Sequence, residues 1–370
     1  MVFHNIDEFI KCIRKNKIYI FGTGTYGMVY TRFFEKENIF FEGYVDNNIE
    51  KQGTVINEKR VYSVDETIGN GGIYLIATIP STSIQIYKGL INKGLKDKDI
   101  ICFDDFSVTD HISERLIKKF DIKINENIKG IFRGKRGIAV GNGPSITKEI
   151  LKKIKNEYTF ATNYAYQMVG IEGWKPTAYL LNDTVMIEEL IKKNNNLLSS
   201  IFSKYIFINQ YSLLNNDFIC EDNEVEILGN RGLIIGENTF FYHTKRYRAD
   251  EKYSAEMDIN NALLDLETTM HAMLQIMIYL GFSEIYMVGM DYNFNSIELK
   301  DGSIKENEEN VKNHSELQKD VSGSYSVYHM TKGFEIINEF AKKNNVKIYN
   351  ATNNTQLDVF EKVDFYNIFK

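Results

Sequence analysis

The chain has 370 residues, 43% hydrophobic and 25% charged, which is typical of a globular protein with room for two domains. Its formal net charge of -6 excludes a protein that coats nucleic acid, because phosphate binding needs a basic surface. Three cysteines without a CxxC pair indicate neither a zinc site nor a disulfide framework. A polar N-terminus and the lack of a long apolar run predict a cytoplasmic protein without a transmembrane segment, and peripheral attachment at the inner membrane face is compatible with this.

The N-terminal part of the chain alternates between expected helices and strands. Helices are expected at 7–15, from the glycine turn at 22–27 to about 37, and at 81–93. Strands are expected at 18–21, 40–45, 73–77 and 100–103. The strands are short apolar runs, which is typical of strands buried on both faces. This alternation predicts a parallel sheet with right-handed crossovers.

The turn after the first strand carries Gly22, Gly24 and Gly27 in the spacing of the dinucleotide fingerprint. Asp46 ends the second expected strand, where a carboxylate can hold a ribose hydroxyl. We therefore interpret 1–107 as an N-terminal Rossmann-like domain of the nucleotide-binding type. The alternative is a unit that binds no ligand and only positions the rest of the chain. The stretch 19–48, with its "GYVDNN" ending, resembles the N-terminal Rossmann-like domains attached to bacterial surface-sugar enzymes.

A polar and basic stretch at 108–136 is interpreted as a connector, and 137–370 as a second domain. Strands are expected there at 137–140, 158–161, 178–181, 205–208, 285–288 and 346–349, and helices up to about 155 and near 185–193, 266–280 and 330–343. The polar stretch 295–324 is interpreted as a mobile loop over the site. The sequence thus predicts an α/β protein of two Rossmann-like domains with mostly parallel sheets.

The second domain opens with a strand and a second glycine turn, Gly141-Asn142-Gly143-Pro144-Ser145. This turn is not a Walker A loop, because no GK[ST] follows. The two glycines free the backbone, Asn142 offers an amide to a ribose or phosphate, and Ser145 sits where a helix N-cap belongs.

Polar residues also follow three later strands of this domain. They are Asn163, Asn182, Asp183 and Asp291. Each is by itself an ordinary cap or turn residue. Because ligands bind beyond the carboxyl ends of parallel strands, the recurrence predicts one crevice shared with Asn142. Thr268 and Thr269, around the start of the helix at 266–280, either receive an anion with their hydroxyls and N–H groups or merely start that helix.

The motifs of the second domain resemble two known families. The segments "GNGPSI", "LLND", "LGFSEIYMVGMDYNF" and "KIYNATNNTQLDVFEKVDF" resemble the 6-hydroxymethylpterin pyrophosphokinase MptE-like family (domain of unknown function 115). Many of its members occur among bacterial surface-polysaccharide or flagellin-glycosylation proteins. The same order of motifs is similar to the sialyltransferases of glycosyltransferase family 42, which also have a histidine before a late helix.

The sialyltransferase resemblance implies roles for four residues. Asn142, Asn163 and Asn182 would contact the CMP of a CMP-sugar donor, and His329 would be the general base on the acceptor hydroxyl. Two departures bear on sialic-acid specificity. That pattern has a tyrosine two residues after the strand-end aspartate, where this chain has Asn293, and its Arg-Ile-Thr-Ser-Gly stretch is replaced here by "DLETTM" at 265–270.

Two histidines are candidate catalytic residues, because the pKa of histidine lies near neutrality. His329 starts the last long helix, and His314 lies in the expected loop at 295–324. We therefore expect a His-assisted glycosyltransferase of surface-glycan synthesis. It would use a nucleotide-activated sugar, with a CMP-sugar such as a CMP-nonulosonate favoured, and a glycan or glycolipid acceptor. Thr268, Thr269 or Tyr325 would stabilise the departing phosphate.

Two other functions stay open at this point. One is an MptE-like diphosphotransferase that takes pyrophosphate from ATP and needs Mg²⁺, with Asp183 and Asp291 as the expected ligands. The other is a non-catalytic scaffold that binds sugar nucleotides. A homo-oligomer is compatible with all three functions.

Overall fold

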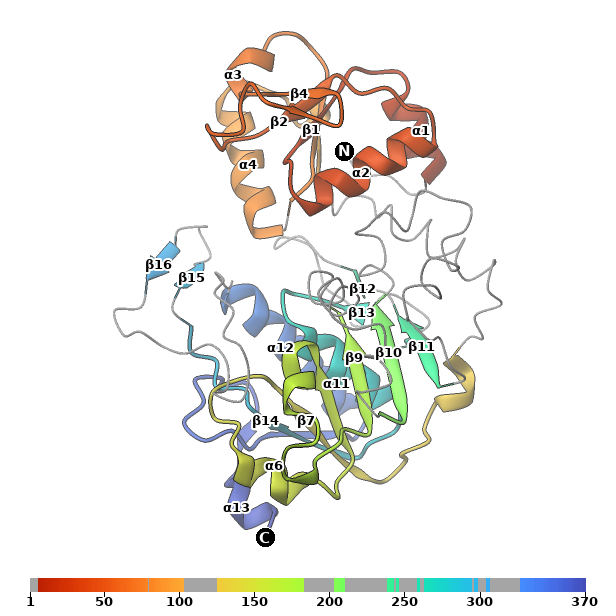
Figure 1. The fold of residues 1–370 in the computed structure, drawn as a ribbon, viewed down its shortest axis with the longest axis vertical. Coiled ribbons are helices and arrows are strands. Elements are labelled where there is room, and N and C mark those ends of the chain that lie inside the picture. Colours follow the sequence, from red (N-terminus) through yellow and green to blue (C-terminus); the bar gives the residue numbers. More distant parts are fainter. Residues whose placement is uncertain are drawn as a thin grey trace. The chain divides into compact units, whose positions relative to one another are not determined.

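The computed structural model describes residues 6–78, 80–102, 125–182, 203–209, 238–242, 244–245, 258–259, 263–294, 296–298, 304–306 and 327–370. The chain divides into two compact units (Figure 1). Described residues up to Cys102 belong to the first unit, and those from Asn125 onward belong to the second.

In the described part of the first unit, six strands form a sheet in the order β3-β4-β2-β1-β5-β6. The strands are β1 (Ile18–Phe21), β2 (Gly43–Val45), β3 (Val55–Ile56), β4 (Lys59–Tyr62), β5 (Ile73–Ile76) and β6 (Ile100–Cys102). All pairings are parallel except that of β3 with β4. The short hairpin-like pair β3–β4 was not predicted.

Helices cover both faces of this sheet. They are α1 (Ile6–Ile13), α2 (Thr25–Lys36), α3 (Val64–Thr67) and α4 (Pro80–Asn92), with a 3-10 turn η1 (Asp97–Asp99). Figure 1 shows α1 and α2 on one face and α3 and α4 on the other. Phe21 and Ile76 pack with Ile86 and Leu90 of α4, as expected for strands whose side chains alternate between two covered faces.

The sheet of the second unit has eight strands within the described ranges, in the order β11-β10-β9-β8-β7-β14-β17-β18. They are β7 (Arg136–Val140), β8 (Thr159–Thr162), β9 (Ala178–Leu181), β10 (Tyr205–Asn209), β11 (Thr239–Tyr242), β14 (Glu284–Val288), β17 (Lys347–Asn350) and β18 (Glu361–Lys362). Every neighbouring pair is parallel. Because the chain runs from β7 out to β11 and then returns to β14 beside β7, the strand order reverses between β7 and β14. Such a switch point is where open α/β sheets bind ligands.

Two long helices pack into the main core of the second unit. α11 (Thr269–Tyr279) and α12 (Val327–Lys343) contribute Met273, Ile276, Phe334 and Ile337 to one buried cluster with the strands. The smaller elements are α6 (Lys148–Ile154), α13 (Phe365–Ile368), η3 (Asn125–Ile128), η4 (Asn163–Met168), η5 (Ile171–Gly173), β12 (Thr244–Lys245), β13 (Leu263–Leu264), β15 (Ser296–Glu298) and β16 (Ile304–Glu306).

The predicted fold class is confirmed: both units are α/β with mostly parallel sheets. Some boundaries were wrong. The helix expected at 266–280 begins only at Thr269, and the last long helix begins at Val327, three residues before the expected start. The domain boundary at 107, most of the connector, and the helix expected at 185–193 fall on residues that the structure does not describe. Of the expected loop at 295–324, the described pieces pair as the antiparallel ladder β15–β16.

Candidate functional site

Topology brings three helix N-termini to one edge of the sheet in the second unit. α6 follows β7, whereas α11 precedes β14 and α12 precedes β17. In a parallel sheet, the helix that connects two strands runs antiparallel to them. It therefore begins at the carboxyl edge of the sheet, whether it is described as following one strand or as preceding the next. The starts of all three helices therefore lie at the edge where the strand-end polar residues lie, and the positive end of each helix dipole favours an anion there.

The glycine turn after β7 is packed directly against the end of β14. Gly141 N–H donates to Val288 O at 2.8 Å, and Gly143 N–H donates to Gly289 O at 2.9 Å. A Cβ on Gly141 would lie 2.4 Å from Gly289 O, so no larger residue fits without displacing backbone. The glycines therefore allow two strand ends to meet at the switch point.

Asp291 holds this turn in place through two hydrogen bonds. Its Oδ1 accepts from Ser145 N at 3.1 Å, and its Oδ2 accepts from Ser145 Oγ at 2.8 Å. Burial raises the pKa of Asp291 above its ordinary value, and the hydrogen bonds from Ser145 oppose that rise. The expectation that Ser145 caps the helix is wrong: α6 starts at Lys148, and Thr147 is its N-cap and accepts from Ile150 N at 3.3 Å.

The two ends of the Asn142 amide differ in their hydrogen bonding within the described residues. Its Nδ2 donates to Thr162 O at 3.4 Å, at the end of the neighbouring strand β8. Its Oδ1 is buried and has no hydrogen-bond partner among the described residues. A buried acceptor without a donor costs about 1–3 kcal/mol, so this atom fits a ligand that carries an N–H or O–H group.

Asn163 links the end of β8 to the start of α11. Its Nδ2 donates to Thr269 Oγ1 at 3.2 Å, its carbonyl accepts from the hydroxyl of Tyr179, and its φ of 49° is left-handed. Thr268 is the N-cap of α11, where its Oγ1 accepts from Met270 N at 3.4 Å. Thr268 and Thr269 thus start the helix and meet Asn163. An anion there stays a prediction.

Hydrogen bonds from two buried side chains orient Asn182. Its Oδ1 accepts from Asn209 Nδ2 at 2.6 Å and from the hydroxyl of Tyr242 at 2.9 Å. Burial raises the pKa of Tyr242 well above its ordinary value, so this hydroxyl stays a neutral donor. These contacts across β9, β10 and β11 set the amide plane of Asn182. Neither partner was predicted, because the pairing depends on strand neighbours that are distant in sequence.

His329 is paired with a carboxylate that was not predicted. Its Nδ1 lies 3.7 Å from Oε1 of Glu267, and their side chains are only 11% and 15% exposed. Glu267 has a φ of 71°, a left-handed value that is strained for a residue with a Cβ, and its Oε1 is buried without a hydrogen-bond donor among the described residues. A carboxylate directly before a Thr N-cap could have indicated this residue. It was missed because residue 267 was expected to lie inside the helix at 266–280.

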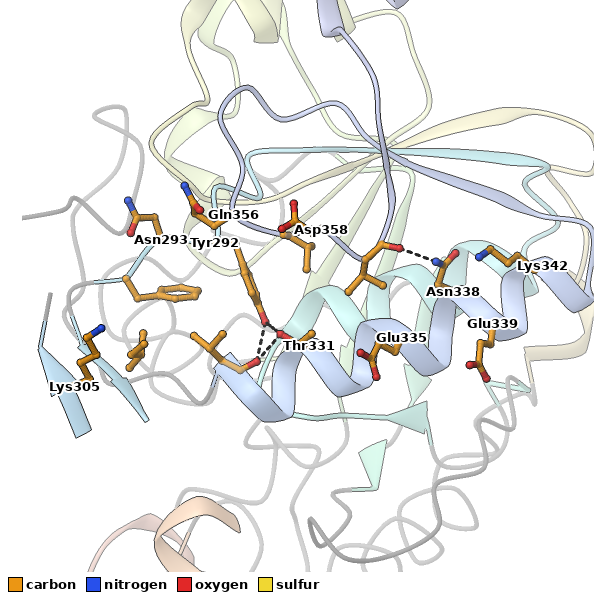
Figure 2. Close-up of a pocket in the computed structure, with 15 residues that line it drawn as sticks. Tyr292, Asn293, Lys305, Thr331, Glu335, Asn338, Glu339, Lys342, Gln356 and Asp358 are labelled. Atoms are coloured by element: carbon orange, nitrogen blue, oxygen red, sulfur yellow. Dashed lines mark hydrogen bonds between the residues drawn. The ribbon is translucent and has the colours of Figure 1, made fainter. Parts of the chain in front are cut away.

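A pocket of 980 Å³ lies along a different flank of α12 (Figure 2). Its walls are the segment 292–294, Ile297 of β15, Lys305 of β16, residues of α12 and the segment 356–359. His329 is not part of this lining. Figure 2 shows Tyr292 reaching from the strand-end segment to α12, where its hydroxyl donates to Val327 O at 3.0 Å and lies 2.8 Å from Thr331 Oγ1. The first turn of α12 is thereby fixed to the end of β14. Asn293, which stands where the sialyltransferase pattern has tyrosine, lines this pocket.

The C-terminal motif "NATNNTQL" braces the same strand end. Thr352 Oγ1 accepts from Met290 N at 3.0 Å, Thr355 Oγ1 donates to Met290 O at 2.6 Å, and Gln356 N donates to Asp291 O at 2.9 Å. Asn350, fully buried, donates from Nδ2 to Thr355 Oγ1 at 3.1 Å. This motif therefore has a structural task, which is to hold Met290 and Asp291 in place.

In the first unit, the glycine turn has the geometry of the fingerprint, but its carboxylate is engaged. Gly22 has a φ of 110°, and a Cβ on Gly27 would lie 2.1 Å from Gly22 O, while a Cβ on Gly24 would meet nothing within 4 Å. Asp46 accepts from Thr23 N at 3.2 Å and Thr23 Oγ1 at 2.5 Å, and Lys51 lies 3.6 Å away. Burial opposes the charged form, but these contacts lower the pKa of Asp46. Nucleotide binding by this unit stays a prediction.

Several predicted residues cannot be placed in the site. His314, Asp183 and Tyr325 lie outside the described residues. Within the described ranges, no group of three or more His, Cys, Asp or Glu side chains is arranged to hold a metal ion. Each oxygen of Asp291 accepts one hydrogen bond from Ser145, and the magnesium site expected at Asp183 and Asp291 stays a prediction. No helix in the described part of the chain is long and apolar enough to span a membrane.

No family model and no curated protein matches the chain. Among solved structures, the monofunctional alpha-2,3-sialyltransferase Cst-I from Campylobacter jejuni is 17% identical, with a TM-score of 0.36, over 64% of this chain and 82% of that one. The MAf glycosyltransferase from Magnetospirillum magneticum AMB-1 is 14% identical, with a TM-score of 0.38, over 94% of this chain, which spans 57% of that protein's length. Similarities this weak support no conclusion about activity, and membership of the MptE-like family stays a prediction.

Proposed function

We propose that the second unit is a glycosyltransferase that moves a sugar from a nucleotide donor to a hydroxyl of a glycan or glycolipid acceptor in surface-glycan synthesis. The observation that carries this proposal is the pairing of His329 with Glu267 at the edge of the sheet where Asn142 presents a buried oxygen that has no hydrogen-bond partner among the described residues. A candidate base and a candidate nucleotide contact thus occupy one edge.

The donor would lie across the switch point between β7 and β14. Asn142 Oδ1 would accept from an N–H or O–H group of the nucleotide, and Asn163 and Asn182 would line the adjoining strand ends. The donor phosphate would gain from the N–H groups at the start of α11. The resemblance of the GNGPS turn to that of family 42 sialyltransferases favours a CMP-sugar, and within that class a CMP-nonulosonate.

The reaction would use His329 as the general base. Glu267 accepting from Nδ1–H would leave the lone pair on Nε2. Nε2 would take the proton of the acceptor hydroxyl while the oxygen of that hydroxyl forms the bond to the anomeric carbon of the donor sugar. The bond from that carbon to the phosphate oxygen would break, and its electron pair would leave with the nucleotide. The imidazolium would face Glu267. The present 3.7 Å is long for a hydrogen bond, and catalytic contacts often tighten once substrate is bound.

The test is a thermal-shift and turnover panel on the full chain. The probes are CMP-N-acetylneuraminate, UDP-N-acetylglucosamine, GDP-mannose, and ATP with Mg²⁺. Saturation at 100 times Kd stabilises by about 2.7 kcal/mol, which is measurable. We expect stabilisation and slow nucleotide release with a nucleotide sugar. Asn142→Ala should weaken binding about tenfold, while His329→Ala should bind the donor but turn it over about 100-fold or more slowly. Asn367→Ala, at an exposed position on α13, is the matched control.

Each alternative function has its own result in this panel. Stabilisation by ATP with Mg²⁺ alone, with AMP as product, would overturn the proposal in favour of the diphosphotransferase. Binding of a nucleotide sugar without any turnover, with or without acceptor, would instead support the scaffold.

A further inference from the structure

A second histidine, His271, is buried between the two segments that carry the His329–Glu267 pair. It is 0% exposed, in the first turn of α11. Its Nδ1 accepts from Leu266 N at 3.2 Å, and its Nε2 lies 3.0 Å from Met330 O. Because a backbone N–H donates to Nδ1, the ring proton must be on Nε2, which donates to the Met330 carbonyl.

The two backbone groups held by this ring are next in sequence to the paired side chains. Leu266 directly precedes Glu267, and Met330 directly follows His329. One imidazole thus joins the backbone on one side of the 3.7 Å pair to the backbone on the other.

We propose that His271 is a positioning residue that holds the carboxylate of Glu267 and the imidazole of His329 at reacting geometry. This inference rests on the proposed function for its catalytic consequence, although the geometry itself is independent of the reaction. The mechanism given above does not use His271, whose side chain is fully buried.

The surroundings of His271 keep the ring in one place. Its centroid lies 4.4 Å from that of Phe334, and a Cβ on Gly333 would come within 2.4 Å of the ring. The absence of a side chain at 333 is therefore what lets α12 approach α11 at this point. A fixed ring with both nitrogens bonded transmits the position of one segment to the other, which a mobile side chain cannot do.

A neighbouring side chain supplies the matched control. Gln275, one turn further along α11 and also 0% exposed, accepts from Leu264 N at 2.9 Å and donates to Leu264 O at 2.8 Å. Gln275 binds two backbone atoms of this loop, whereas His271 binds one, and within the described residues Gln275 makes no hydrogen bond to α12. Losing Gln275 therefore disturbs the loop without removing the link across the pair.

The strained backbone of Glu267 agrees with this role. A left-handed conformation is unfavourable for a residue with a Cβ and persists only where its neighbours are fixed. Here Leu266 is held by His271, and Thr268 is held as the N-cap of α11. Releasing Leu266 would let Glu267 relax to an ordinary conformation and carry its carboxylate away from His329.

The experiment compares His271→Gln, His271→Asn and Gln275→Met in the full chain. The first readout is the long-range ¹H–¹⁵N spectrum of histidine-labelled protein, which reports ring tautomers without any need for activity. In the unsubstituted protein we expect His271 as the Nε2–H form and His329 as the Nδ1–H form. The His271 variants should lose the tautomer preference of His329, and Gln275→Met should keep it.

The second readout is CMP release from CMP-N-acetylneuraminate. We expect kcat to fall about tenfold or more in both His271 variants with KM for the donor unchanged, and Gln275→Met to stay within about twofold. Equal losses in all three variants, an unchanged His329 tautomer, or an Nδ1–H form of His271 in the unsubstituted protein would overturn the proposal. If the chain releases no CMP at all, the proposed function fails on that donor, and the spectra still decide whether His271 orders the pair.

Discussion

The burial of His271 predicts a particular loss of stability on acidification. Burial in the core lowers the pKa of this side chain from 6.5 to about 3, and the hydrogen bond to Met330 O opposes the shift only partly. The folded protein therefore keeps His271 neutral at a pH where the unfolded chain protonates it. Because the unfolded state then binds more protons, the free energy of unfolding must fall as the pH falls below 6.5.

The size of the effect follows from the two pKa values. Each pH unit between them removes about 1.4 kcal/mol from the free energy of unfolding. Integration from pH 7.5 to pH 5 gives a loss of about 2 kcal/mol from this one residue. A loss of that size is a sizeable part of the 5–15 kcal/mol that stabilises a typical domain.

The assay is urea unfolding at pH 7.5 and pH 5, followed by the fluorescence of Trp174. This is the only tryptophan of the chain, it is 0% exposed, and it lies in the second unit together with His271. His271→Gln will be less stable at both pH values, but its loss between them should be about 2 kcal/mol smaller than that of the unsubstituted protein. Gln275→Met should keep the original pH dependence. Equal pH dependence in the unsubstituted protein and His271→Gln would show that His271 is not held neutral in the fold, and the reasoning would be refuted.

Three further predictions test other parts of the structure. Gly143→Ala places a Cβ 1.9 Å from Asp291 Oδ2, so it should abolish nucleotide-induced thermal stabilisation, whereas Gly89→Ala, with nothing within 4 Å, should leave it unchanged in the same assay. Thr147→Ala removes the true cap of α6 and should lower the free energy of unfolding by about 1 kcal/mol in urea titrations, with nucleotide affinity retained; a loss under 0.2 kcal/mol would contradict the cap assignment. The lowered pKa of Asp46 gives the first unit stability that is present above the ordinary value of 3.8 and lost as the pH falls through the lower folded value. Hydrogen exchange of β1 amides, corrected for intrinsic rates, should therefore show less acid sensitivity in Asp46→Asn, and an unaltered sensitivity would argue against it.

The strands and their polar ends were predictable because each rests on local sequence. A buried parallel strand is a short apolar run, and the residue after it starts a turn, so Asn142, Asn163 and Asn182 were found without knowledge of the sheet. The sheet order could not be read in this way. That β14 lies beside β7, and thereby brings Asp291 to the glycine turn, depends on contacts between residues 146 positions apart.

The errors come from tertiary contacts that override local preference. Ser145 has the residue type and place of an N-cap, but its hydroxyl and N–H both donate to Asp291, and the helix starts later. Glu267 stands in an apolar periodic segment that reads as helix. Its backbone is nevertheless left-handed, because Leu266 N donates to a side chain of α11 instead of continuing a helix. No single-sequence pattern reports either contact.

One strand-end segment joins the two halves of the candidate site. After β14, Met290 is held by the C-terminal motif, Asp291 holds the glycine turn, and Tyr292 holds the first turn of α12. Three consecutive residues therefore fix the element proposed to bind the donor and the helix that carries the proposed base. Tyr292 has a φ of 59°, a strained value that turns its side chain toward α12 while Asp291 points at the glycine turn. Consecutive side chains of a regular strand point to opposite faces of the sheet. If β14 continued as a regular strand, Asp291 and Tyr292 would point to opposite faces and could not reach the glycine turn and α12 at the same edge. The left-handed conformation of Tyr292 is thus what allows one segment to contact both the glycine turn and α12. A substitution that destabilises this segment should impair donor binding and the position of His329 together.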